Sequence, residues 1–189
     1  MSATVVTVRR SACLRSRLRT SDCSACADAC PVQALRVGRE GVTAQAGCTG
    51  CGRCRAACPM GAIAVSGFAA MATAEVGAGG ATLLVDCARF GAPPAGPDSL
   101  RVPCLGGLSP GDLLALCAQA PGRTVLLADH EACALCDSGR TVHAAAAVLQ
   151  SVRDLMREAN VPEDRLPRLV RRPAPPSVAD PMQSGGRAR

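Results

Sequence analysis

A fifteen-residue cysteine pattern that occurs twice, 28 positions apart, constrains this chain more than any other feature. The first copy reads CSACADACPVQALRV and runs from Cys23 to Val37. The second copy reads CGRCRAACPMGAIAV and runs from Cys51 to Val65. Each copy has three cysteines at the same spacing, and a proline follows the third. A short duplicated unit of this kind predicts two similar halves that build one small domain.

Cysteine usage indicates metal binding. Thirteen cysteines in 189 residues mean either a disulfide framework or metal ligation. The N-terminus has no apolar segment of the kind found in secretory signals, and no apolar run is long enough to span a bilayer. A cytoplasmic protein is therefore expected, and its reducing surroundings favour metal ligation over disulfides.

The second copy extends upstream to Cys48, which completes the run Cys48-x2-Cys51-x2-Cys54-x3-Cys58-Pro59. This run resembles the cluster-binding sequence of bacterial two-cluster ferredoxins, in which the fourth cysteine ligates the neighbouring cluster. The resemblance covers residues 1–66 and implies two [4Fe–4S] clusters. Cluster two would be held by four thiolates: Cys30, Cys48, Cys51 and Cys54.

The first copy departs from this pattern because Thr20 stands where a cysteine is expected. The nearest upstream thiol is Cys13, ten positions before Cys23. Two outcomes are open: Cys13 supplies the missing ligand, or three thiolates remain and the cluster is a [3Fe–4S] form or has an exogenous ligand. The first is favoured because a flexible insertion closes at small entropic cost. Cluster one would then be held by Cys13, Cys23, Cys26 and Cys58.

Residues 1–66 are expected to form an α+β domain with the ferredoxin-like βαββαβ order. Alternating or β-branched residues predict four strands, two of them in a hairpin. A short helix is expected after each Cys-Pro, since proline suits the first helical turn. The predicted strands are Thr4–Val8, Leu35–Val37, Val42–Ala44 and Ile63–Val65.

The rest of the chain predicts a small α/β domain with a parallel sheet. Residues 67–80 are rich in small residues and indicate a linker, and residues 172–189 indicate a disordered tail. Between them, residues 81–171 alternate apolar strands with two helices, the first capped by Ser109. The strands are expected at Ala81–Asp86, Leu100–Pro103 and Thr124–Asp129, and the second helix at Arg140–Ala159.

Four further cysteines follow the ends of these strands, where parallel sheets bind ligands. A third metal site is expected from Cys87, Cys104, Cys133 and Cys136, with iron–sulfur ligation favoured over structural Zn. His130 is a fallback ligand beside them, whereas His143 is expected to be solvated or capped. Cys117 is expected to be an inert core cysteine on a helix.

A second resemblance rests on Val102–Gly107, the strand Thr124–Asp129 and the turn Asp137–Arg140. Residues 81–170 resemble the delta subunit of methyl-viologen-reducing hydrogenases. The resemblance implies a [2Fe–2S] cluster on the four C-terminal cysteines and electron exchange between a hydrogenase and a flavin-based partner. The chain departs from the family where a Cys-Cys-x-x-Cys run is replaced by Cys87-Ala88-Arg89-Phe90.

The positive charge of the N-terminal segment suggests an acidic partner. The formal net charge is +6, all 21 basic residues are arginine, and five of them crowd residues 9–19. This segment is either a solvated loop or a docking face for an acidic redox enzyme such as a hydrogenase, dehydrogenase or flavin-dependent reductase. Nucleic acid is disfavoured, because two phenylalanines are the only aromatic side chains apart from histidine.

The sequence contains no recognisable nucleophile–base pair or phosphate-binding loop. An electron carrier or electron-transfer subunit is therefore favoured over a catalyst. A redox sensor that changes partner or nucleic-acid binding on cluster loss is the alternative, and disulfide reduction at the C-terminal thiols is a third hypothesis.

Overall fold

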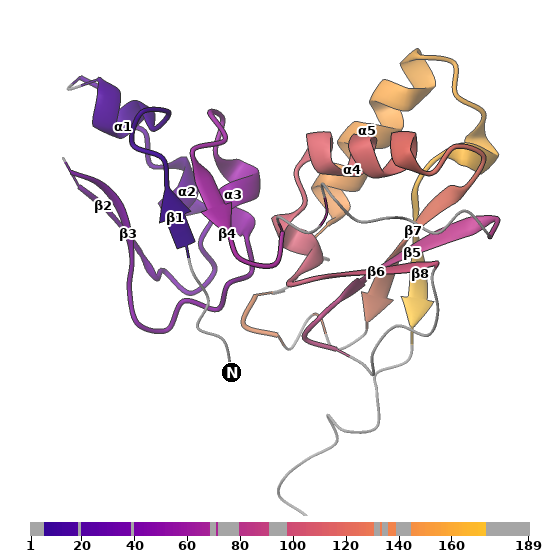
Figure 1. Cartoon of the computed structure of the whole chain (residues 1–189), viewed down its shortest axis with the longest axis horizontal. Coiled ribbons are helices and arrows are strands. Elements are labelled where there is room, and N and C mark those ends of the chain that lie inside the picture. Colours follow the sequence, from indigo (N-terminus) through magenta and orange to yellow (C-terminus); the bar gives the residue numbers. More distant parts are fainter. Residues whose placement is uncertain are drawn as a thin grey trace, which may run out of the picture.

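The computed structural model describes residues 6–18, 20–38, 40–68, 71, 80–90, 98–130, 133, 136–138 and 145–172. Two lobes lie side by side, the first built from the repeats and the second around a sheet (Figure 1). The chain has α+β content, with a four-stranded parallel sheet in its C-terminal part.

The N-terminal lobe contains two antiparallel strand pairs. The strand β1 pairs with β4, and β2 pairs with β3 as the hairpin expected from the sequence. Three short helices lie between the strands, and α2 and α3 occupy equivalent places in the two repeats. The elements are β1 (Val6–Val8), α1 (Leu14–Arg17), α2 (Ala25–Asp28), β2 (Leu35–Gly38), β3 (Gly41–Ala44), α3 (Arg53–Ala57) and β4 (Ile63–Val65).

The prediction of a helix after each Cys-Pro is wrong. The helices α2 and α3 precede Cys30 and Cys58, and turns follow both cysteines. Only four residues separate Cys30 from the start of β2, so the chain must reverse at once. It does so with a positive φ of 51° at Gln33, matched by 55° at the repeat-equivalent Gly61. The helix α1 was not predicted and occupies part of the insertion between Cys13 and Cys23.

The C-terminal lobe confirms the predicted parallel sheet, with strand order β6-β5-β7-β8 and all neighbours parallel. The fourth strand, β8, was not predicted, because three of its five residues are arginines and it has no long apolar run. Charged side chains are typical of a sheet edge. The strands are β5 (Thr82–Cys87), β6 (Ser99–Val102), β7 (Thr124–His130) and β8 (Arg168–Arg172).

The helices α4 (Pro110–Gln119) and α5 (Ala146–Glu158) lie against each other over one face of this sheet (Figure 1). The start of α4 confirms the predicted cap: Ser109 Oγ accepts from the Asp112 N–H at 3.2 Å, and Asp112 Oδ2 accepts from the Ser109 N–H at 2.8 Å. One apolar stripe of α5 faces the core through Leu149 and Val152. Short 3-10 helices are η2 (Leu105–Gly107) and η4 (Glu163–Arg165).

Buried side chains form one continuous cluster through both lobes. The segment predicted as a linker contributes Phe68 and Met71, which are 2% and 5% exposed. Most of that segment, the predicted tail beyond Arg172 and the start of the second predicted helix lie outside the described residues. No helix in the described part of the chain is long and apolar enough to cross a membrane.

Candidate metal centre

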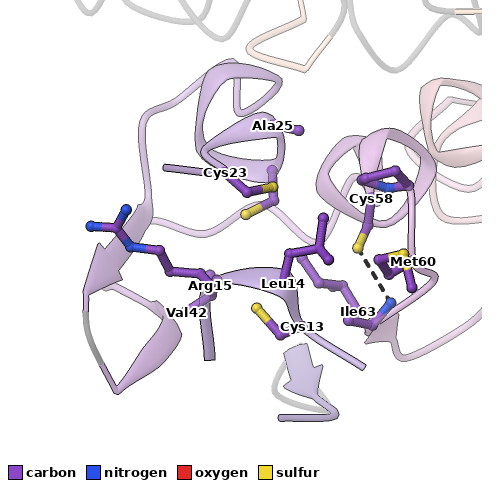
Figure 2. Close-up of a pocket in the computed structure, with 12 residues that line it drawn as sticks. Cys13, Leu14, Arg15, Cys23, Ala25, Val42, Cys58, Met60 and Ile63 are labelled. Carbon is purple, nitrogen blue, oxygen red and sulfur yellow. Dashed lines mark hydrogen bonds between the residues drawn. The ribbon is translucent and has the colours of Figure 1, made fainter. Parts of the chain in front are cut away.

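The first of two hollows in the N-terminal lobe is lined by all four cysteines predicted for cluster one: Cys13, Cys23, Cys26 and Cys58. Cys13, Cys23 and Cys58 reach it from three separate segments (Figure 2). The remaining lining is mostly apolar and includes Leu14, Val42, Met60 and Ile63. Four soft donors around an apolar hollow fit the chemistry of an iron–sulfur cluster.

The second hollow is lined by the four cysteines predicted for cluster two: Cys30, Cys48, Cys51 and Cys54. Its apolar walls come from Val6, Val32, Leu35 and Val65. Each repeat therefore sends its third cysteine to the other hollow, since Cys30 belongs to the first repeat and Cys58 to the second. The structure brings together both predicted sets in the crosswise arrangement.

Matching hydrogen bonds fix these two crossing thiols. The Ala34 N–H donates to Cys30 Sγ at 3.2 Å, and the repeat-equivalent Ala62 N–H donates to Cys58 Sγ at 3.3 Å. The tight turns that follow each Cys-Pro aim these amides back at the sulfurs. Backbone N–H groups that donate to cluster sulfurs are one means of setting a reduction potential.

Backbone contacts give Cys13 the place that Cys48 has in the other half. The Arg9 N–H donates to Ala62 O at 2.8 Å, just as the Gln45 N–H donates to the repeat-equivalent Ala34 O at 2.9 Å. Cys13 lies four residues after the first of these donors, and Cys48 lies three residues after the second. Cys13 is 9% exposed, whereas Thr20 is exposed and does not line the hollow.

Burial raises the pKa of two of these thiols, Cys26 and Cys54. It raises the pKa of Cys26, and the neighbouring Cys58 and Cys23 raise it further. Burial, with Cys51, Cys48 and Cys26, raises the pKa of Cys54 to about 12.

Cys13 behaves differently from these two thiols. Burial raises its pKa, but hydrogen bonds from Ser16 and Arg15 outweigh that effect, so the pKa is lowered. Thiolates held at such buried positions need compensating positive charge, which bound iron would supply.

The C-terminal cysteines lie at one edge of the parallel sheet. Cys87 and Cys104 are 2% and 5% exposed at the carboxyl ends of β5 and β6, and Cys133 and Cys136 follow β7. A hydrogen bond with Cys104 lowers the pKa of Cys87, and the same bond raises the pKa of Cys104. Burial raises the pKa of Cys133, and Cys104 and Cys136 raise it further. The four residues predicted for a third site therefore lie within electrostatic range of one another.

Two further predictions concern residues near these thiols. Cys117 lies on α4 outside both hollows, and burial raises the pKa of this thiol to about 11. His130 Nε2 lies 2.7 Å from Asp86 Oδ1, with both side chains buried, so its near partner is a carboxylate. Sequence reasoning missed Asp86, although an acid inside an apolar strand directly before Cys87 was a usable signal. His143 lies outside the described residues.

Across the described residues, no three His, Cys, Asp or Glu side chains gather closely enough to hold a single metal ion. A [4Fe–4S] cluster does not require that proximity, because each of its four thiolates binds a different iron atom. The described cysteines are all unpaired thiols, which leaves their sulfur atoms available as ligands.

Crosswise thiolate sets around apolar hollows define a class of protein that binds iron–sulfur clusters. The comparison with known families agrees: residues 20–68 match the family model of the LdpA Fe-S cluster-binding domain. The match covers about a quarter of the chain, includes seven of the eight N-terminal ligand candidates and begins after Cys13. This region is therefore an iron–sulfur cluster domain. No curated protein and no solved structure matches the chain.

Proposed function

We propose that the protein relays single electrons, through two [4Fe–4S] clusters in a ferredoxin-like βαββαβ domain, to or from a partner oxidoreductase. The observation that carries this proposal is the pair of hollows, each lined by four cysteines and each sharing one cysteine crosswise with the other repeat. When bound, the clusters supply one-electron chemistry. In this proposal the protein acts as a carrier or an electron-transfer subunit of an oxidoreductase complex rather than as a catalyst by itself.

The chain's own residues perform three tasks in this proposal. Apolar side chains such as Val42, Ile63 and Val65 exclude water from the thiolates. The amides of Ala34 and Ala62 hold Cys30 and Cys58 and tune the potentials. The crosswise cysteines keep the two hollows adjacent, in agreement with the effect of Cys26 on the pKa of Cys54.

A third cluster on the C-terminal thiols extends the proposal. Cys87, Cys104, Cys133 and Cys136 lie at or just beyond the carboxyl ends of β5, β6 and β7, and the first two are buried. Their chemistry suits a [2Fe–2S] cluster, as the resemblance to hydrogenase delta subunits implies. The C-terminal lobe would then both dock the protein to its partner and carry a redox centre.

An acidic redox enzyme is the proposed partner. Arg9, Arg10 and Arg17 are exposed near the first hollow, and two large apolar side chains, Leu18 and Met60, are 52% and 42% exposed beside them. A basic surface with exposed apolar side chains fits an acidic docking face with an apolar patch. Reducing cytoplasm is the proposed location.

A redox sensor is the second candidate, and one observation favours it: Cys13, the proposed fourth ligand of cluster one, lies outside the matched family region. Loss of cluster one would free α1, since Cys13 stands directly before this short helix and would anchor it to the cluster. The freed segment would change binding to a partner or nucleic acid.

Anaerobic coulometric titration separates the two functions. A relay takes up about two electrons per chain, or about three with a third cluster, and returns them with its iron retained. Cluster loss on the first oxidation, coupled to a change in binding, would favour the sensor instead.

A further inference from the structure

The loop that carries cluster two lies directly against the backbone of η2. We call residues 48–54 the cluster-two loop. A side chain at Gly107 would place its Cβ 2.6 Å from the Cys51 carbonyl oxygen and would clash with the ring of Phe68. A Cβ at Gly52 would lie 3.1 Å from the Gly107 Cα. Glycine at both positions therefore lets the cluster-two loop and η2 come into backbone contact. The residue directly before η2 is Cys104.

Arg55 stabilises the contact between the cluster-two loop and η2. It lies on α3 between Cys54 and Cys58, and its guanidinium donates to both carboxylate oxygens of Asp112 at 2.6 and 2.7 Å. The same group donates to Gly107 O at 3.1 Å and lies 5.2 Å from the centre of the Phe68 ring. The Arg55 and Asp112 side chains are 23% and 16% exposed, so the paired geometry is well shielded from solvent.

A second group of contacts holds the start of the cluster-two loop. Thr49 Oγ1 shares a hydrogen bond of 3.0 Å with Ser138 Oγ. The Arg89 guanidinium donates to Thr49 O at 2.7 Å. Ser138 lies two residues after Cys136, and Arg89 lies two residues after Cys87.

The contacts share one property: each comes from a segment that carries a cysteine of the third set. Gly107 follows Cys104 by three residues, Arg89 follows Cys87 by two, and Ser138 follows Cys136 by two. Three segments distant in sequence therefore converge on one loop. The sequence alone offered no sign of this convergence, because each contact bridges at least 40 positions.

We propose that the cluster-two loop and the C-terminal thiols form one coupled metal unit, with Arg55 as the positioning residue that fixes their separation. This inference rests on the proposed function, because it takes both cysteine sets as metal-binding. It makes the second hollow the neighbour of the C-terminal site. The Gly52–Gly107 contact is the place where the two lobes couple.

The test compares Arg55→Leu with a matched control, Arg153→Leu, in the full iron-loaded chain. Arg153 is also 23% exposed and also donates to one carboxylate and one carbonyl, Glu163 and Pro167, but both partners lie in the C-terminal lobe. EPR of the reduced protein measures the magnetic interaction between the C-terminal [2Fe–2S] cluster and cluster two, and hydrogen exchange measures opening of residues 104–112. Iron content is measured in every sample.

Arg55→Leu is expected to lose the interaction signal at unchanged iron content. Its exchange at residues 104–112 is expected to rise about tenfold, equivalent to about 1.4 kcal/mol of opening free energy. Arg153→Leu should keep the signal. An interaction signal in Arg55→Leu equal to that of Arg153→Leu would overturn the proposal.

A second pair of variants, Gly107→Ala and its control Gly111→Ala, tests the same contact if Arg55→Leu does not fold. Gly107→Ala places a methyl group against Cys51 O and should weaken the interaction, whereas in Gly111→Ala the nearest atom, Ser109 Oγ, is 3.8 Å away. Wild-type protein with both N-terminal clusters and no C-terminal signal overturns the coupled unit and leaves the two-cluster relay standing. Wild-type protein without iron instead overturns the proposed function itself.

Discussion

Replacing Cys13 tests how the irregular first repeat completes its site. In the structure Cys13 is 9% exposed and lines the first hollow. It follows the Arg9–Ala62 backbone hydrogen bond, as Cys48 follows the equivalent Gln45–Ala34 bond. Cys13→Ser therefore removes one of four thiolates from that hollow. By cluster arithmetic, iron should fall by about one per chain, as a [4Fe–4S] cluster becomes [3Fe–4S].

The assay is iron analysis of anaerobically purified protein, with EPR of the oxidised sample. Wild-type protein should lack the [3Fe–4S] signal, and Cys13→Ser should show it. Cys117→Ser is the control, because Cys117 lies outside both hollows and should leave iron and signal unchanged. A [3Fe–4S] signal already present in wild-type protein, unaltered by Cys13→Ser, would refute the assignment of Cys13 as a ligand.

Three further predictions follow from local geometry and charge. Gly52→Ala should lower the denaturant midpoint more than Gly47→Ala. Both glycines have positive φ, but only a Cβ at position 52 would lie 2.5 Å from the Phe68 ring. Equal falls in the midpoint would contradict the close contact. The positive φ alone costs about 1–2 kcal/mol in each. Cys117, with its pKa raised to about 11 by burial, should alkylate slowly at pH 8 and about tenfold faster per pH unit up to that value; a plateau near pH 9 in mass-spectrometric labelling would contradict it. Arg17→Glu should slow oxidation of the reduced protein by anionic ferricyanide at low ionic strength and speed oxidation by cationic hexaammineruthenium, and a stopped-flow difference that persists at high salt would argue against a charge effect.

The sequence predicted the cysteine sets because their chemistry depends on local spacing. Three thiols of the cluster-two set come from one short loop, and the duplicated pattern indicates which thiol of each repeat crosses over. Cys13 was harder to assign, since seven extra residues separate it from Cys23 relative to the second half. The helix α1 takes up part of these extra residues, and the Arg9–Ala62 hydrogen bond places Cys13 beside the first hollow; neither feature can be inferred from the cysteine spacing.

The error over the Cys-Pro helices has a clear physical origin. Proline favours the first turn of a helix, but it also suits the tight turns seen here. The strands β2 and β4 begin within five residues of Cys30 and Cys58, and this short span excludes a helix. The edge strand β8 was missed because it has too few apolar residues to produce a strand pattern.

Long-range polar contacts could not be predicted at all. The Arg55–Asp112 and His130–Asp86 pairs join residues 57 and 44 positions apart, and neither residue type nor spacing identifies such partners. They depend on how the lobes meet and on strand order in the sheet. The placement of Cys87, Cys104, Cys133 and Cys136 at one sheet edge was predictable, because parallel strands bring their carboxyl ends together.

The most direct test of the central claim is iron and acid-labile sulfide per chain in anaerobically prepared protein, with EPR after dithionite reduction. The account predicts about eight irons with two [4Fe–4S] signals, or about ten with an added [2Fe–2S] signal when the C-terminal thiols are loaded. Fewer than about four irons per chain would contradict the claim that the two hollows of the N-terminal lobe each hold a cluster.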